Sequence, residues 1–98
     1  MIDKNLIKLA IRSTEKYSRS QYIIFDLLVD VSIDYEVNAS TKFIVERTGF
    51  IRHTVATALK ALQKDAILIK NFEFQNTYRL NEEKLKKIIE LYHTKQTK

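Results

Sequence analysis

The sequence contains a single glycine, Gly49, and no proline in 98 residues, so almost nothing in it interrupts regular secondary structure. Glycine adopts a positive φ angle more readily than any other residue, and a chain needs that angle where a helix ends in a tight turn. Gly49 lies between two stretches with apolar residues at helical spacing, 42–48 and 51–65. We therefore expect two helices that meet at Gly49 at a steep angle.

Helical periodicity predicts three further helices, at 1–12, at 19–33 and from Asn81 onward. Ser18 and Gln21 have the spacing of a capping box ahead of the second of these helices. Apolar residues occupy more than one side of that helix, so we expect other elements to cover it on more than one side.

Strand-forming residues predict a short strand at 35–39 and a hairpin at 67–80 whose turn lies near 73–76. We expect Phe72 and Phe74 to lie in the core or in an interface, because large aromatic side chains are seldom left in water. The resulting order of elements predicts one domain over residues 1–98, of the α+β class and mainly helical.

The charges are unevenly distributed along the chain. The net charge is +5, from 17 basic and 12 acidic residues, but residues 26–39 carry four acidic and no basic side chains. Asp26, Asp30 and Asp34 are spaced four apart and are expected to form an acidic ridge. A basic surplus segregated in this way favours a polyanion as partner, with solubility alone as the alternative.

Several function classes lack the residues that they need. There is no cysteine, and His53 and His93 are forty positions apart, so we expect no metal site. Neither a glycine-rich phosphate loop nor a nucleophile motif is present, so we expect no cofactor and no enzyme activity. No stretch is typical of a signal peptide or a membrane span, which favours a cytoplasmic protein without a membrane partner.

The helix expected at 51–65 has two distinct faces. Val55, Ala58, Leu59 and Leu62 form an apolar stripe, and short polar or cationic side chains form the opposite face. Arginine can bind guanine through two hydrogen bonds, and threonine can contact a base edge or a thymine methyl group. The residues on this second face suit the DNA major groove; they are Arg52, His53, Ala56, Thr57, Lys60 and Lys64. A plain solvated position is the alternative for His53.

Residues 40–80 resemble the helix-turn-helix and wing of bacterial winged-helix regulators of the MarR and GntR kinds. They are also similar to the winged-helix domains of plasmid and phage replication initiators. The residues that carry the resemblance are Ser40, Thr41, Ile44, Val45, Gly49, Arg52, His53, Thr54, Val55, Ala58, Leu59, Leu62, Ile67, Tyr78, Arg79 and Leu80. Two features depart from the pattern: Ile51 stands where a capping Ser or Thr is usual, and the wing has no glycine.

The resemblance implies a winged helix-turn-helix at 18–80, with an extra helix at each end, at 1–17 and 81–98. It also implies sequence-specific binding of double-stranded DNA. The DNA-binding residues expected on this basis are Thr41, Lys42, Arg52, His53, Thr54, Thr57, Lys60, Lys70, Asn76 and Arg79. A small transcriptional regulator is the first interpretation. A plasmid or phage replication or maintenance factor that binds origin repeats, and a winged helix that binds other proteins, are the alternatives.

Two apolar stripes lie outside the winged-helix segment, one in each terminal helix. They predict a homodimer that binds an inverted repeat, because exposed apolar surface is costly. The residues expected at the dimer interface are Leu6, Leu9, Leu85, Ile88, Ile89 and Tyr92. Packing of both stripes on their own chain is the alternative.

Overall fold

The computed structural model describes residues 1–96 and contains, within them, five helices and one three-stranded antiparallel sheet. This arrangement confirms the expected α+β class with mainly helical content. The elements in chain order are α1 (Lys4–Ser13), α2 (Arg19–Val31), β1 (Glu36–Asn38), α3 (Thr41–Thr48), α4 (Arg52–Lys64), β2 (Leu68–Lys70), β3 (Thr77–Leu80) and α5 (Glu82–Gln96).

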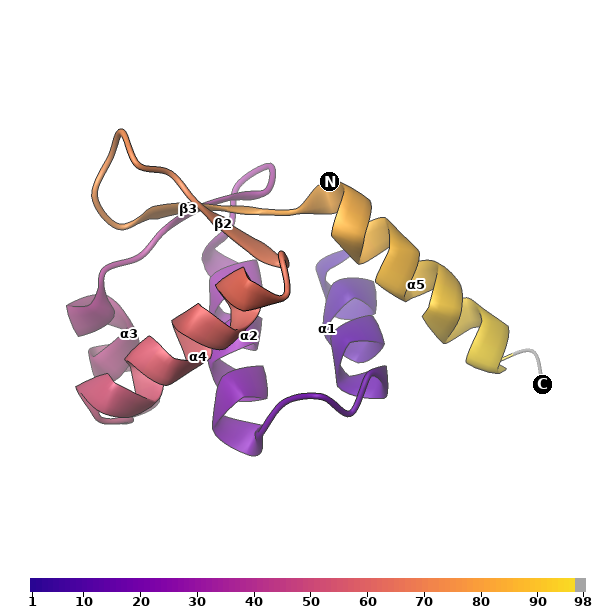
Figure 1. The fold of residues 1–98 in the computed structure, drawn as a ribbon, viewed down its shortest axis with the longest axis horizontal. Helices are drawn as coiled ribbons and strands as arrows, with labels where there is room; N and C mark the ends of the chain where they lie inside the picture. The colour runs from indigo at the N-terminus through magenta and orange to yellow at the C-terminus, as the bar shows by residue number, and fades with distance from the viewer. Residues whose placement is uncertain (97–98) are drawn as a thin grey trace.

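The helix α2 is the centre of the helical layer. It packs against α1, α3, α4 and β1, and it buries apolar residues on more than one side, as its sequence predicts. The sheet contacts α2 and α4 and lies above the helices in the view of Figure 1, while α1 and α5 lie next to each other on the side of the molecule away from α3. The apolar side chains of all these elements form one continuous core cluster.

Local capping residues set where the first two helices begin. The helix α1 begins at Lys4 rather than at Met1, because Asp3 Oδ1 accepts hydrogen bonds from the Asn5 and Leu6 amides at 2.7 and 3.2 Å. The capping box ahead of α2 is confirmed, since Ser18 and Gln21 each accept a hydrogen bond from the other's backbone amide.

The helix α2 ends at Val31, two residues earlier than expected. The Ser32 hydroxyl donates to the Val29 carbonyl at 2.6 Å, and Asp34 and Tyr35 then adopt positive φ angles of 50° and 71°. This turn leaves Ile33 exposed and starts β1. Asp34 therefore lies beyond the helix, and the expected ridge of three aspartates was wrong at this residue.

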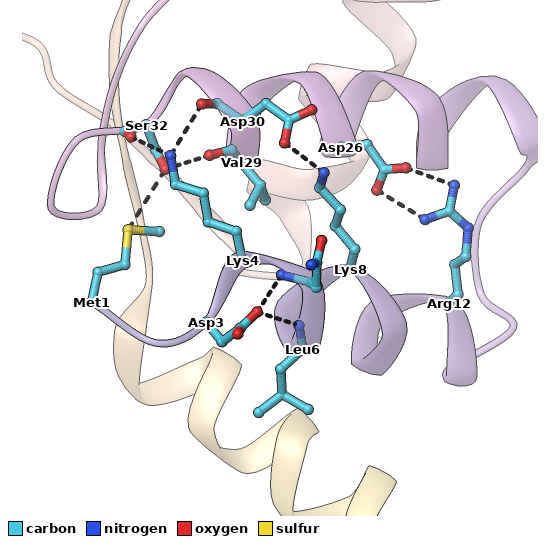
Figure 2. A network of polar contacts seen from close by, with 11 residues as sticks. Met1, Asp3, Lys4, Leu6, Lys8, Arg12, Asp26, Val29, Asp30 and Ser32 are labelled. Carbon is cyan, nitrogen blue, oxygen red and sulfur yellow. Dashed lines mark hydrogen bonds and ion pairs between the residues drawn. The ribbon is translucent and has the colours of Figure 1, made fainter.

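Ion pairs with α1 account for the rest of that ridge (Figure 2). The guanidinium of Arg12 binds both carboxylate oxygens of Asp26, at 2.9 and 2.7 Å, and Lys8 Nζ lies 2.5 Å from Asp30 Oδ1. Lys4 Nζ donates to the carbonyls of Asp30 and Ser32 at the end of α2, at 3.0 and 2.9 Å. Many of the charged residues in the first 34 positions therefore pair with each other, and these pairs join the antiparallel helices α1 and α2.

In the sheet, β3 lies between β1 and β2 and pairs antiparallel with both. Residues 71–76 connect β2 to β3 and extend beyond the paired strands. Phe72 and Phe74 lie in this connection and are 91% and 63% exposed. Of their two expected places, the core was wrong, because the loop carries them past the end of the strand pairing, and a place in an interface stays a prediction.

The helix α5 packs on α1. Leu85, Ile88 and Ile89 are at most 8% exposed in the isolated chain, while Leu6 and Tyr92 pack against the core in partly buried positions. The packing of these residues matches the alternative, in which the stripes pack on their own chain. It removes the reason for assigning them to a dimer interface.

Leu9 differs from the other five residues expected at the dimer interface, because it is 54% exposed.

In the described residues, no helix is both long and apolar enough to cross a membrane. The same residues include no cluster of three or more side chains suited to hold a metal ion.

Candidate nucleic-acid interface

The turn between α3 and α4 depends on Gly49. It has a φ angle of 78° and its amide donates to the Val45 carbonyl at 2.8 Å, which ends α3 in a left-handed residue as expected. A Cβ atom at this position would meet no atom within 4 Å. The turn therefore needs glycine for its backbone conformation and not for space.

Ser40 caps α3, since its hydroxyl accepts a hydrogen bond from the Phe43 amide at 3.0 Å. Thr41 is thus the first residue of α3. Lys42 follows it as an exposed side chain on the same helix. Arg47, which the sequence analysis did not select, is also exposed on α3, with its guanidinium 5.4 Å from the centre of the Phe43 ring.

The helix α4 extends over 52–64, one residue shorter at each end than expected. Its N-cap residue, Ile51, supplies no side-chain hydrogen bond, so no side chain satisfies the first amides of the helix. These amides form the positive end of the helix dipole, which favours an anion such as phosphate.

The buried face of α4 is as expected, with Val55, Ala58, Leu59 and Leu62 in the core. On its other face Arg52, His53, Thr57 and Lys60 are exposed, and Thr54 is half-buried. The Thr57 hydroxyl donates to the His53 carbonyl at 2.9 Å, which leaves its oxygen free to accept a hydrogen bond.

The cations on α4 differ from those on α1 in their partners. Among the described residues, the ion pairs are Lys8 with Asp30, Arg12 with Asp26, and Lys86 with Glu82. Arg52 and Lys60 take part in none of these pairs. Their charges are therefore available to an external anion.

Lys70, the last residue of β2, and Asn76, the last residue of the connection, flank the loop between β2 and β3. Lys70 Nζ lies 5.9 Å from the centre of the Phe72 ring, which is a cation–π distance. Asn76 adopts a φ angle of 58°, and its carbonyl accepts a hydrogen bond from the Ala39 amide at 2.9 Å. The loop thus places Asn76 in a left-handed conformation, which asparagine adopts more readily than most other residues.

Arg79 lies in the sheet, where it lines a small pocket together with Lys70. In β3 it alternates with Tyr78 and Leu80, whose side chains are buried on the face of the sheet that covers the core. Arg79 projects from the opposite face, where it is paired in register with Glu36 on β1 and Ile69 on β2. The sheet therefore separates its side chain from the exposed face of α4.

The remaining expected residues lie on α3, on α4 and near the 71–76 loop. These three segments occupy one end of the molecule, and α1 and α5 occupy the other (Figure 1). At this end of the molecule α4 exposes unpaired cations, with α3 and the 71–76 loop beside it.

No protein-family model matches the sequence, and no curated protein or solved structure matches the chain.

Proposed function

We propose that this chain is a winged helix-turn-helix protein that binds double-stranded DNA in a sequence-specific way and acts as a small regulator of transcription. The observation that carries the proposal is the exposed face of α4, where Arg52 and Lys60 have no carboxylate partner among the described residues. The major groove, about 12 Å wide, admits an α-helix and displays acceptors that arginine can read.

The order of the elements supports this proposal. Two helices joined at Gly49 precede an antiparallel hairpin, and β1 completes the sheet by pairing with β3. This is the order of a winged helix, in which α4 would be the recognition helix and the 71–76 loop would be the wing.

Unpaired cations also surround the face of α4 that is proposed to contact DNA. Lys8 and Arg12 on α1 are neutralised by aspartates of α2, so they contribute little to the attraction of phosphate. The exposed cations outside the described ion pairs on α3, α4 and β2 are Lys42, Arg47, Arg52, Lys60, Lys64 and Lys70. Other exposed and unpaired cations, such as Lys16, Lys87 and Lys95, lie near α1 and α5. Charge alone therefore does not set the orientation on DNA, and the first group adds to the attraction of phosphate to the exposed face of α4.

Selection from a pool of random duplexes, followed by titration of the enriched sequence, tests the proposal. Arg52→Glu and Lys60→Glu are each expected to weaken binding at least tenfold. Lys86→Glu on α5 causes the same change in net charge at the other end of the molecule and is expected to have little effect. Failure to enrich any sequence, or equal weakening by all three substitutions, would contradict the proposal.

A further inference from the structure

A groove of about 410 Å³ lies where the end of α1, the end of α4 and one side of α5 come together. Its walls are mostly apolar, with contributions from Ile67, Ile88 and Leu91. Leu91 is 64% exposed, although the rest of the apolar side of α5 is covered by the chain. The groove is therefore the place where apolar surface of α5 stays open to a partner.

Four lysines also line this groove: Lys16 from the α1–α2 connection and Lys84, Lys87 and Lys95 from α5. None of the four belongs to an ion pair within residues 1–96. Lys95 Nζ instead donates to the Ser13 carbonyl at 2.9 Å, which holds the end of α5 against the end of α1. Cations gathered in this way repel one another until an anion neutralises them.

Asp65 is the one acidic residue that lines the groove. Its Oδ2 atom accepts a hydrogen bond from the Tyr17 hydroxyl at 2.5 Å. The Tyr17 hydroxyl thus holds this carboxylate. Because the groove has one acidic residue and four lysines, an excess of positive charge surrounds its apolar walls.

The exposure of the lining residues bears on what can occupy the groove. Lys16, Lys87, Leu91 and Lys95 are all exposed, so the groove is open along its rim. Small-molecule pockets bury about 70–90% of their ligand, whereas a peptide can place apolar side chains in an open groove and keep its polar face in water. The phosphate backbone of DNA offers no apolar group for Leu91.

We propose that this groove binds an acidic peptide segment of a partner protein. An apolar side chain of the segment packs on the exposed Leu91, over the buried Ile67 and Ile88 at the base of the groove, and the carboxylates of the segment pair with the lysines of the rim. Because the groove lies at the end of α4 farthest from Arg52, peptide and DNA can bind to the same chain at once. The inference thus extends the proposed function and does not depend on it.

The full chain can be titrated by fluorescence anisotropy against labelled peptides of Asp and Glu that carry two leucines, two, three or four positions apart. We expect saturable binding of at least one such peptide, with NMR amide shifts confined to the groove. Peptides with Lys in place of Asp and Glu are expected not to bind.

Adjacent residues of α5 provide a matched pair of variants. Lys87→Glu reverses a lysine of the groove and is expected to weaken peptide binding at least tenfold, whereas Lys86→Glu reverses its neighbour outside the groove and is expected to change it less than twofold. Leu91→Ala is expected to weaken binding more than Leu9→Ala, although both side chains are exposed and neither change disturbs the core.

Three results would overturn the proposal: no saturable binding of any acidic peptide, equal effects of Lys86→Glu and Lys87→Glu, or peptide-induced shifts on α3 and α4 instead of the groove. Self-association of the chain through the groove, seen by sedimentation and abolished by Leu91→Ala, would assign the surface to a second copy and also overturn it.

Discussion

The hydroxyl of Tyr17 donates a hydrogen bond to Asp65 Oδ2 at 2.5 Å and so joins two residues that are 48 positions apart. Tyr17 lies in the connection between α1 and α2, and Asp65 is the C-cap residue of α4. Burial raises the pKa of Tyr17 well above its usual value, and the hydrogen bond to the Asp65 carboxylate raises this pKa further. The contact thus fixes the end of α4 to the first helical pair.

This contact predicts how stability depends on pH. The unfolded chain releases the Tyr17 proton near the ordinary pKa of 10.0, and the folded chain releases it only at higher pH. The stabilisation is therefore complete below about pH 10 and is lost as pH rises toward the folded pKa. Burial also raises the pKa of Tyr78, which adds a smaller loss of the same sign.

Urea unfolding at about pH 8 and about pH 11 measures this dependence. Tyr17→Phe is expected to lose less stability than the wild type between the two pH values, because it lacks the hydroxyl that titrates. An equal loss in both proteins would show that Tyr17 titrates alike in the folded and unfolded chains.

The pairing of Arg12 with Asp26 predicts a measurable coupling energy. The geometry is bidentate and Asp26 is partly buried, so a double-mutant cycle with Arg12→Ala and Asp26→Ala should give about 1 kcal/mol, reduced by salt. The same cycle on Glu82 and Lys86, an exposed pair within α5, should give a smaller coupling energy. Coupling no larger than that of the α5 pair would contradict a role for Arg12 in joining α1 to α2.

The left-handed conformation of Gly49 predicts a cost for any side chain at this position. Gly49→Ala should destabilise the fold by about 1–2 kcal/mol, although there is space for the methyl group. Gly49→Asn should cost less, because asparagine tolerates this conformation. Ala66, with a φ angle of 59°, is the converse case, and Ala66→Gly should not destabilise the fold. Thermal unfolding of the three variants checks these values, and a more stable Gly49→Ala protein would contradict them.

The exposure of Phe72 predicts that it contributes almost nothing to folding. Phe72→Ala should change the free energy of unfolding by less than about 0.5 kcal/mol. Phe25 is 1% exposed, and Phe25→Ala should cost about 3–5 kcal/mol. Chemical denaturation compares the two. A loss above about 1 kcal/mol for Phe72→Ala would mean that the 71–76 loop packs on the core.

Features that depend on neighbouring residues were predictable from the sequence. The capping box of Ser18 and Gln21 and the left-handed end of α3 at Gly49 both involve residues within four positions of each other. The apolar stripe of α4 follows from helical periodicity in the same way.

Features that depend on distant contacts were not predictable in this way. Apolar stripes in α1 and α5 show that each helix needs a partner, but not whether the partner belongs to the same chain. The spacing of Lys8 and Arg12 does match that of Asp30 and Asp26, and antiparallel packing of α1 on α2 brings both pairs together. That signal was present in the sequence, whereas none pointed to the contact between Tyr17 and Asp65.

The salt dependence of duplex binding tests the central claim most directly. Four to six phosphate contacts at about −0.9 each predict a slope of about −4 to −5 for the logarithm of the association constant against that of salt concentration. Lys42→Ala should reduce the steepness by about one contact, and Arg52→Ala should also relax the preference at one base pair, at a cost of about 1–3 kcal/mol. A slope near zero, or no detectable binding to any duplex at about 50 mM salt, would contradict the proposed function.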